Sequence, residues 1–139
     1  MSKNILMNQE EFKRTLKRLS HEIIEKYIDD LDNLAIIGIR TRGEFLAKRI
    51  HKHIIDFKKI DIPFGILDVT FYRDDLRTNL GSPQVKSSEI MFPIENKKII
   101  LIDDVLYTGR TIRAAMDEIF SFGRPSSIGL CVLSDRGHR

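Results

Sequence analysis

The chain alternates between two patterns of apolar residues, one with the helical period and one typical of buried strands. Apolar residues recur every three to four positions in three segments, which we expect to be helices: residues 8–28, 43–56 and 110–122. Shorter runs rich in branched and aromatic residues indicate four strands: residues 34–39, 64–72, 98–102 and 127–133. The second helix is expected to turn four apolar side chains inward: Phe45, Leu46, Ile50 and Ile54. Because strands and helices alternate, the pattern predicts an α/β fold, a mostly parallel, twisted sheet with helices on both faces.

Size and composition fit a single domain. The chain has 139 residues, of which 42% are hydrophobic and 31% charged, enough to bury one core and stay soluble. No apolar run is long enough to cross a membrane, and the first residues lack the apolar centre of a secretory signal. The single cysteine, Cys131, lies in a strand-like run and has no partner for an internal disulfide. We therefore expect a buried, inert thiol in a cytoplasmic protein.

Polar residues at the ends of the predicted strands supply the candidate chemistry, because ligands of parallel α/β sheets bind beyond the carboxyl ends of the strands. Asp103 and Asp104 end the third strand, and paired carboxylates, which only accept hydrogen bonds, suit the vicinal hydroxyls of a ribose. The turn that follows consists of Tyr107, Thr108, Gly109, Arg110 and Thr111. This turn opens a helix, and helix amino ends suit phosphate. Together these residues predict a ribose 5-phosphate site; the alternative is an acidic strand end before a Thr-capped helix.

Two other polar segments follow strands. The first consists of Arg40, Thr41, Arg42 and Gly43. Its two guanidinium groups beside a glycine form a second candidate anion site, although the same residues would also suit a solvated turn. The second segment, residues 73–89, is long and polar for a loop in a compact domain. We expect it to be a mobile lid.

Longer motifs resemble a known family. The stretch "IILIDDVLYTGRT" (99–111) is similar to the phosphoribosyl pyrophosphate (PRPP) motif of type I phosphoribosyltransferases. Further matching motifs are "GIRTRG" (38–43), "LDVTFYRDDL" (67–76), "VLYTGRTIRAAMD" (105–117), "GRPSSI" (123–128) and "VLSDRGHR" (132–139). Together they resemble the PyrR family, regulators of pyrimidine operon attenuation with uracil phosphoribosyltransferase activity. The resemblance runs from about Asn8 to the last residue.

The resemblance implies a role for each site residue. Asp103 and Asp104 would hold the ribose hydroxyls, the turn from Tyr107 to Thr111 would cradle the 5-phosphate, and Arg40 to Gly43 would line the pyrophosphate site. Arg73, at the root of the polar segment, would close over the leaving group. Mg²⁺ would arrive bound to PRPP, so no direct protein ligands to a metal are expected. The implied reaction joins uracil to PRPP and gives UMP and pyrophosphate.

Two departures from related sequences change what is expected of the substrate and of the turnover. Purine-salvage relatives commonly carry an aspartate base where this chain has Tyr107, and a neutral phenol is a poor base, so the position favours a pyrimidine. Family members continue beyond Arg139 with a segment that completes a hood over the base. We therefore expect residues 1–139 to be one phosphoribosyltransferase domain without this hood, with weak turnover.

Basic residues cluster on the first predicted helix: Arg14, Lys17, Arg18 and His21. Their spacing places them opposite the apolar face. A solvated helix face is the usual role of such charges, but the PyrR resemblance implies RNA binding here and at His138 and Arg139. His51 and His53 alternate on the second helix and therefore do not form a metal pair.

The sequence thus predicts a bifunctional regulator of a pyrimidine operon. It would bind leader mRNA in response to UMP and PRPP, promote transcription attenuation, and act as a uracil phosphoribosyltransferase. We also expect a homo-oligomer and no membrane partner. Two alternatives remain: a phosphoribosyltransferase acting on uracil or a purine without RNA regulation, and a truncated, inactive homologue.

Overall fold

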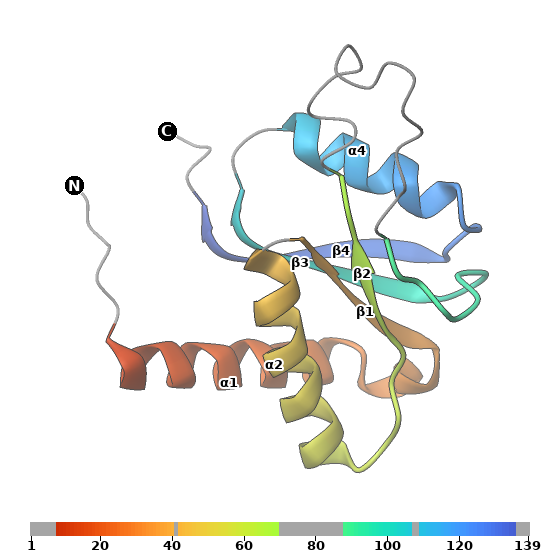
Figure 1. Cartoon of the computed structure of the whole chain (residues 1–139). Coiled ribbons are helices and arrows are strands. Elements are labelled where there is room, and N and C mark those ends of the chain that lie inside the picture. Colours follow the sequence, from red (N-terminus) through yellow and green to blue (C-terminus); the bar gives the residue numbers. More distant parts are fainter. Residues whose placement is uncertain (1–7, 41, 70–87, 107–108, 136–139) are drawn as a thin grey trace.

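Four parallel strands form the centre of the molecule. The computed structural model describes residues 8–40, 42–69, 88–106 and 109–135. Its elements are α1 (Gln9–Lys26), a 3₁₀ helix (Ile28–Asn33), β1 (Leu34–Ile39), α2 (Arg42–Lys58), β2 (Phe64–Leu67), β3 (Lys98–Leu106), α4 (Gly109–Phe120) and β4 (Ser127–Asp135). The strand order is β2-β1-β3-β4, and every neighbouring pair is parallel. Helices α1 and α2 cover one face of the sheet and α4 covers the other (Figure 1), which confirms the predicted α/β architecture.

Strand β1 is apolar on both faces because it separates two cores. Leu34 and Ile36 belong to the cluster that contains buried residues of α1 and α2. Ile37 and Ile39 belong to the cluster that contains buried residues of α4. Successive strand side chains point to opposite faces, so a central parallel strand needs an uninterrupted apolar run, and all six residues of β1 are buried.

The start of α1 is fixed by a capping box. The side chain of Asn8 accepts a hydrogen bond from the backbone N–H of Glu11 at 2.8 Å, and the Glu11 carboxylate accepts one from the N–H of Asn8 at 3.1 Å. These two bonds satisfy donors that the helix itself leaves unpaired. The helix ends at Lys26, two residues earlier than predicted, because the next residues form the 3₁₀ helix.

Two strand boundaries differ from the prediction. Strand β2 ends at Leu67 instead of continuing to residue 72; the last three residues of that predicted run lie outside the described part of the chain. Strand β3 extends to Leu106 instead of residue 102, and it pairs with β4 as far as Asp135. The acids of the PRPP-like motif therefore lie within a strand, not beyond its end.

The prediction that Phe45 faces inward is wrong, since its side chain is 61% exposed. Leu46, Ile50 and Ile54 are buried as expected, and Ala47 joins them. Successive helical residues are separated by about 100° around the axis. The buried stripe of α2 begins at Gly43 and continues at Leu46, and Phe45 falls outside it, where it lines a cavity together with Phe12 of α1.

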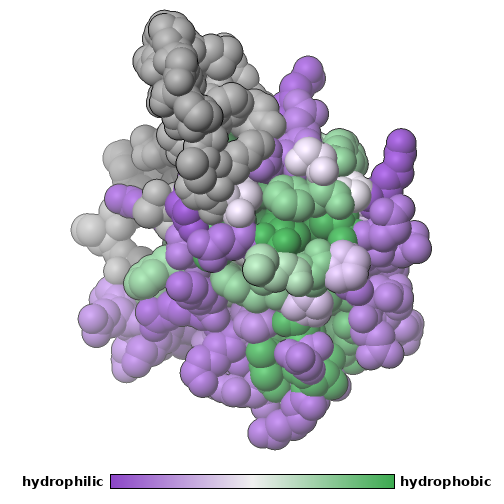
Figure 2. All heavy atoms as spheres, turned by 45° about the vertical axis from the view of Figure 1, so that its right-hand side comes forward, coloured by the Kyte–Doolittle hydropathy of each residue, from purple (hydrophilic) through white to green (hydrophobic). Residues whose placement is uncertain are grey.

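The β2 edge of the sheet is partly covered by the chain that returns after residue 87. Ile66 and Glu89 exchange two backbone hydrogen bonds, of 3.0 and 2.7 Å, in an antiparallel bridge. The view in Figure 2 shows apolar side chains gathered between hydrophilic margins. Met91, just after the bridge, is 89% exposed. Within the described ranges, no helix is long and apolar enough to span a membrane.

Burial raises the pKa of the Cys131 thiol in β4 from about 9 to about 11, and the negative charge of Glu22 adds to the shift. We expect iodoacetamide to alkylate the native chain more slowly than the urea-unfolded chain at pH 8, because the thiolate is the nucleophile. The folded pKa lies above the unfolded value, so the free energy of unfolding should fall as pH rises from about 9 to about 11. Mass spectrometry measures the alkylation rate, and urea titrations at several pH values measure the free energy of unfolding. Equal alkylation rates of the native and unfolded chains would contradict the burial of Cys131.

Candidate active site

Three of the chemically distinctive segments meet at the end of the sheet where the strands have their carboxyl termini. Arg40 follows β1, Asp68 follows β2, and Asp103 and Asp104 lie in the carboxyl-terminal half of β3. Because the strands are parallel, their carboxyl ends lie side by side. The described part of the site is therefore built from strand ends that are distant in sequence.

A direct backbone contact joins α2 to β3 at this edge. A Cβ atom added to Gly43 would lie 2.4 Å from the carbonyl oxygen of Ile102 and 3.0 Å from the Cα of Asp103. A second close approach lies one turn further along α2. A Cβ atom added to Gly38 of β1 would meet the Cβ of Ala47 at 2.6 Å. Both glycines are required because any larger side chain would push α2 away from the sheet.

The two aspartates have different surroundings. The Asp103 carboxylate accepts a hydrogen bond from the backbone N–H of Asp104 at 2.8 Å. The Asp104 carboxylate accepts one from the guanidinium group of Arg42 at 3.4 Å. The Arg42 side chain is 78% exposed, whereas that of Asp104 is 21% exposed. The pair is therefore a weak one, and Arg42 stays available to a ligand above the aspartates.

Arg40 is surrounded by carboxylates. Its guanidinium nitrogens lie 3.3 Å from Glu44, 4.0 Å from Asp68 and 3.5 Å from Glu89, and its side chain is 24% exposed. The sequence suggested an anion-binding role for Arg40, but much of its charge is already balanced by these acids. Its participation in a pyrophosphate site stays a prediction.

The residues that flank the range 70–87 contact each other beside Arg40. Ser88 accepts a hydrogen bond at its hydroxyl from the backbone N–H of Asp68, at 2.8 Å. Arg40 contacts both Asp68 and Glu89, and Glu89 is bridged to Ile66. Residues 88 and 89, the last two of the predicted lid, are thus hydrogen-bonded to the end of β2, and the mobility of the lid stays a prediction. The rest of that prediction lies outside the described residues.

Several predicted site residues are not described by the structure: Thr41, Arg73, Tyr107, Thr108, His138 and Arg139. The backbone of Gly109, Arg110 and Thr111 forms the first turn of α4, as the phosphate-turn hypothesis requires. Only two residues separate this turn from β3. The amino end of α4 thus follows directly from the strand that carries the two aspartates.

Arg42 and Asp104 border a cavity of about 550 Å³. Its other lining residues are Phe12, Glu44, Phe45, Leu46 and Leu133. Phe12 and Leu133 were not predicted to line the site, because apolar residues of amphipathic helices and buried strands are expected in the core. The only available signal was the position of Phe45 just after the "RTRG" segment.

The donor set at the strand ends suits a hard cation carried by a ligand. Carboxylate oxygens are preferred by Mg²⁺, which usually keeps several waters and binds one or two protein carboxylates together with substrate phosphates. Among the residues that the structure describes, no group of three or more His, Cys, Asp or Glu side chains is placed to hold a metal. The two carboxylates of Asp103 and Asp104 suit a metal that arrives bound to pyrophosphate and keeps its waters, so a direct protein ligand is not required.

The basic residues of α1 do not all lie on one outer face, because Lys17 and His21 line a cavity together with residues of α2. Arg14, Lys17 and Arg18 are exposed, and His21 is half-buried. Arg18 forms an exposed ion pair of 3.0 Å with Glu22. His51 does not share their surroundings, because its ring nitrogen contacts the carbonyl oxygen of Ile62.

Comparison with known proteins defines the class. The phosphoribosyl transferase domain family matches residues 2–139. A hypoxanthine-guanine phosphoribosyltransferase from Bacillus anthracis superposes with a TM-score of 0.73 at 21% identity, covering 100% of this chain and 77% of that chain. A purine phosphoribosyltransferase from Pyrococcus horikoshii gives 0.69 at 22% identity, covering 94% and 77%. At such identities the likeness shows the fold alone, and with the family match it defines a phosphoribosyltransferase domain.

Closer relatives give the particular family. "Bifunctional protein PyrR" of Listeria monocytogenes is 50% identical over 138 residues, which cover 97% of this chain and 75% of the relative. The proteins of that name from Caldicellulosiruptor bescii and Staphylococcus saprophyticus are 51% and 47% identical, with 96% and 100% of this chain and 73% and 79% of the relatives covered. The chain belongs to the PyrR family, as its motifs predicted.

Replacing Gly43 with alanine tests the contact between α2 and β3. The added methyl group would overlap the Ile102 carbonyl, so we expect a loss of about 1–3 kcal/mol in the free energy of unfolding. A displacement of about 1 Å between reacting groups typically costs about 100-fold in rate, so turnover should fall more than stability explains. Gly129→Ala is the control, because its new methyl group would meet the ends of two side chains, the Tyr27 hydroxyl at 3.0 Å and Ile100 Cδ1 at 3.3 Å, with the nearest backbone atom at 4.0 Å. Equal effects of both variants on turnover would argue against this contact as the determinant of site geometry.

Proposed function

We propose that the chain transfers the phosphoribosyl group of PRPP to uracil, forming UMP and pyrophosphate, and that it binds pyrimidine-operon leader mRNA in response to UMP and PRPP. The observation that carries the enzymatic part is the contact of Gly43 with β3, which sets Arg42 beside Asp104. Membership of the PyrR family supports both parts. Relatives that are about half identical bear the PyrR name, whereas the purine enzymes share only the fold.

The aspartates act on the ribose. In this proposal the carboxylates of Asp103 and Asp104 accept hydrogen bonds from the two ring hydroxyls. As the bond between the anomeric carbon and the pyrophosphate oxygen breaks, positive charge develops on the ribose, as in glycoside hydrolysis. The half-buried carboxylates stabilise this charge without reorganising. A uracil ring nitrogen forms the new bond to the anomeric carbon, the electron pair of the broken bond leaves with pyrophosphate, and the proton of the ring nitrogen passes to solvent water.

The leaving group lies on the α2 side of the aspartates. Arg42 is largely exposed and offers a guanidinium that can bind pyrophosphate oxygens in a bidentate manner. Mg²⁺ bound to PRPP supplies further neutralisation of the charge that develops on the leaving group. The amino end of α4, which begins at Gly109, is assigned to the 5-phosphate. Arg40 is assigned a positioning role because it faces three carboxylates.

The regulatory part rests on α1. Arg14, Lys17 and Arg18 are exposed on one helix, where they are accessible to phosphates of an RNA. Sequence-specific recognition of RNA mostly uses unpaired bases, because the deep groove of the A-form helix is hard to read. His138, Arg139 and a homo-oligomer remain parts of the proposal. A phosphoribosyltransferase without RNA binding is the competing function, and the two differ in their affinity for leader mRNA.

Asp104→Asn tests the enzymatic part. The amide keeps the shape of the side chain but removes the charge that stabilises the reacting ribose, so we expect turnover to fall about 100-fold or more. The assay follows labelled uracil into UMP in the presence of PRPP and Mg²⁺. Asp117→Asn, an exposed change on α4, is the matched control and should keep its activity. No turnover by the folded parent chain would refute the enzymatic proposal.

Removing two charges from α1 tests the regulatory part. We expect Arg14→Ala with Arg18→Ala to weaken leader mRNA binding roughly tenfold and to reduce the salt dependence by about two counterions. Binding of UMP, measured by calorimetry, should not change, because neither residue lines the strand ends. The control is Lys97→Ala with Arg124→Ala, which removes two cations near the amino ends of β3 and β4. Equal gel-shift affinity of the α1 variant and the parent would exclude this helix surface from RNA binding.

A further inference from the structure

A second cavity lies between the two helices on one face of the sheet. It has a volume of about 250 Å³. Helix α1 contributes Lys17, His21 and Ile24, and α2 contributes His53, Asp56 and Phe57. None of these residues belongs to the strand ends where the aspartates lie. The cavity is slightly smaller than the pockets of about 300–1,000 Å³ that hold drug-sized molecules.

Two aromatic rings meet at this cavity. The rings of His21 and Phe57 pack edge to face, with centroids 4.5 Å apart and an interplanar angle of 81°. Phe57 is 59% exposed, although it lies on a helix whose neighbouring residue Ile54 is completely buried. Its exposed ring therefore lies beside cations instead of within the core. Exposed aromatic and imidazole rings are the groups on which unpaired bases stack.

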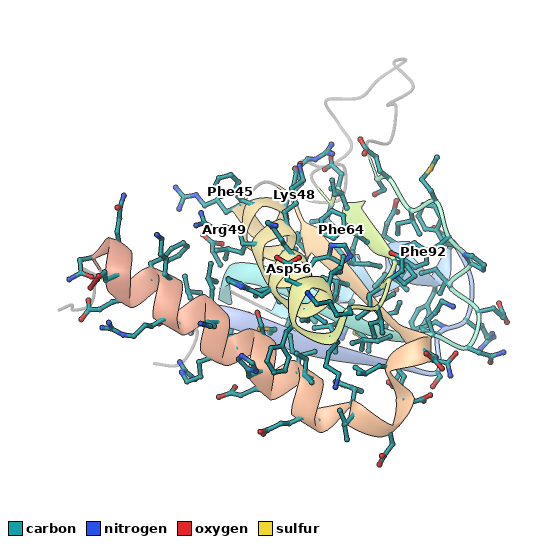
Figure 3. The ribbon with its side chains drawn as sticks, turned by 90° about the horizontal axis from the view of Figure 1, so that it is seen from below. Phe45, Lys48, Arg49, Asp56, Phe64 and Phe92 are labelled. Carbon is teal, nitrogen blue, oxygen red and sulfur yellow. The ribbon has the colours of Figure 1, made fainter. Side chains whose placement is uncertain are left out.

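Two cations lie close to His53 of this cavity, Lys17 on α1 and Arg49 on α2. Arg49, labelled on α2 in Figure 3, lies one helical turn before His53. Its guanidinium group lies over the ring of Phe12 on α1, 5.6 Å from the centroid. Burial lowers the pKa of His53, and the charges of Lys17, Arg49 and His21 lower it further, whereas Asp56 opposes them. Asp56 forms an exposed ion pair of 3.2 Å with Lys52, so its charge is partly balanced. The cleft thus has an excess of cations around an apolar floor.

We propose that the cleft between α1 and α2 binds one unpaired nucleotide of an RNA. The base stacks on Phe57 beside His21, with Ile24 beneath it. Lys17 and Arg49 bind the flanking phosphates. The basic surface of α1 alone binds phosphates without regard to sequence, whereas this cleft also accepts a base. The inference rests on the proposed RNA-binding function and names the part of the surface that recognises an unpaired base.

The donors and acceptors in the cleft suit a base edge. His53 offers a ring nitrogen and Asp56 a carboxylate, and both lie on α2. A phosphate that approaches Lys17 and Arg49 also offsets the cations that hold the pKa of His53 low, so RNA binding should favour protonation of this imidazole. RNA affinity should therefore rise as pH falls from about 7.5 to about 6. The rise should be smaller in His53→Gln.

The first test is a gel-shift titration of the full chain with pyrimidine-operon leader mRNA. We expect Phe57→Ala to weaken binding roughly tenfold, the usual scale for loss of one stacked base. The matched control is Phe120→Ala, since Phe120 is similarly exposed, at 51%, but lies on α4. Calorimetry with free UMP distinguishes a site for a nucleotide within RNA from a site for a free nucleotide. If the cleft binds RNA, the affinity for UMP should be the same in Phe57→Ala and the parent.

A second test needs no variant and decides the matter if Phe57→Ala does not fold. Leader mRNA carrying 5-iodouridine at unpaired positions is cross-linked to the parent chain by light, and the modified peptides are identified by mass spectrometry. We expect cross-links at His21 or Phe57. Cross-links confined to other elements, or equal RNA affinity of folded Phe57→Ala and the parent, would overturn the cleft assignment alone.

The remaining outcomes are also decisive. If the parent does not bind the RNA at all, the regulatory part of the proposed function and the cleft assignment fail together, whereas uracil turnover is unaffected. If Phe57→Ala loses affinity for free UMP as well as for RNA, the cleft is a site for free nucleotide, and its assignment to RNA is wrong. A loss of RNA affinity alone, absent from Phe120→Ala, supports it.

Discussion

The contact between the backbone of Gly43 and the carbonyl group of Ile102 determines how the rest of the site is arranged. It leaves no room for a side chain, so the first turn of α2 lies directly on β3. Gly38 and Ala47 repeat this close packing further along the same helix. Arg42 and Asp104 are neighbours for this reason, and not because of their own ion pair, which is exposed and weak. Tightly packed backbone thus supplies the precision that phosphoribosyl transfer needs.

The charges at the strand ends are balanced in a way that favours a metal-bound substrate. Arg40 is shared among Glu44, Asp68 and Glu89, while Asp103 and Asp104 add two more carboxylates close by. Free pyrophosphate would meet repulsion from these acids, and among the side chains that the structure describes at the strand ends, Arg42 by itself would not offset it. Pyrophosphate that carries Mg²⁺ brings its own positive charge to the carboxylates. The local charge balance therefore agrees with a magnesium-dependent reaction.

The sequence predicted the sheet well because burial on both faces leaves a clear pattern: "LAIIGI" is an uninterrupted apolar run, and β1 matches its predicted range. The end of β3 was not predicted, because pairing with β4 keeps polar residues in the strand, and composition alone does not report on a partner strand. The aspartates could be proposed from the sequence because their motif is continuous; their role in the site stays a prediction. The acids around Arg40 were missed because Asp68 and Glu89 reach it through the fold. The cleft was missed because each helix was considered alone.

Helix α2 connects the two proposed sites physically. Its first turn carries Gly43 and Arg42 at the strand ends, and its last turns carry His53 and Phe57 in the cleft. Its 17 residues span about 25 Å as one continuous helix. Close packing at Gly38 and Ala47 leaves little freedom for one end to move without the other. If a nucleotide at the strand ends favours one position of α2, the same helix would favour one shape of the proposed cleft. Linkage would then require that RNA bound in this cleft strengthens nucleotide binding by the same factor.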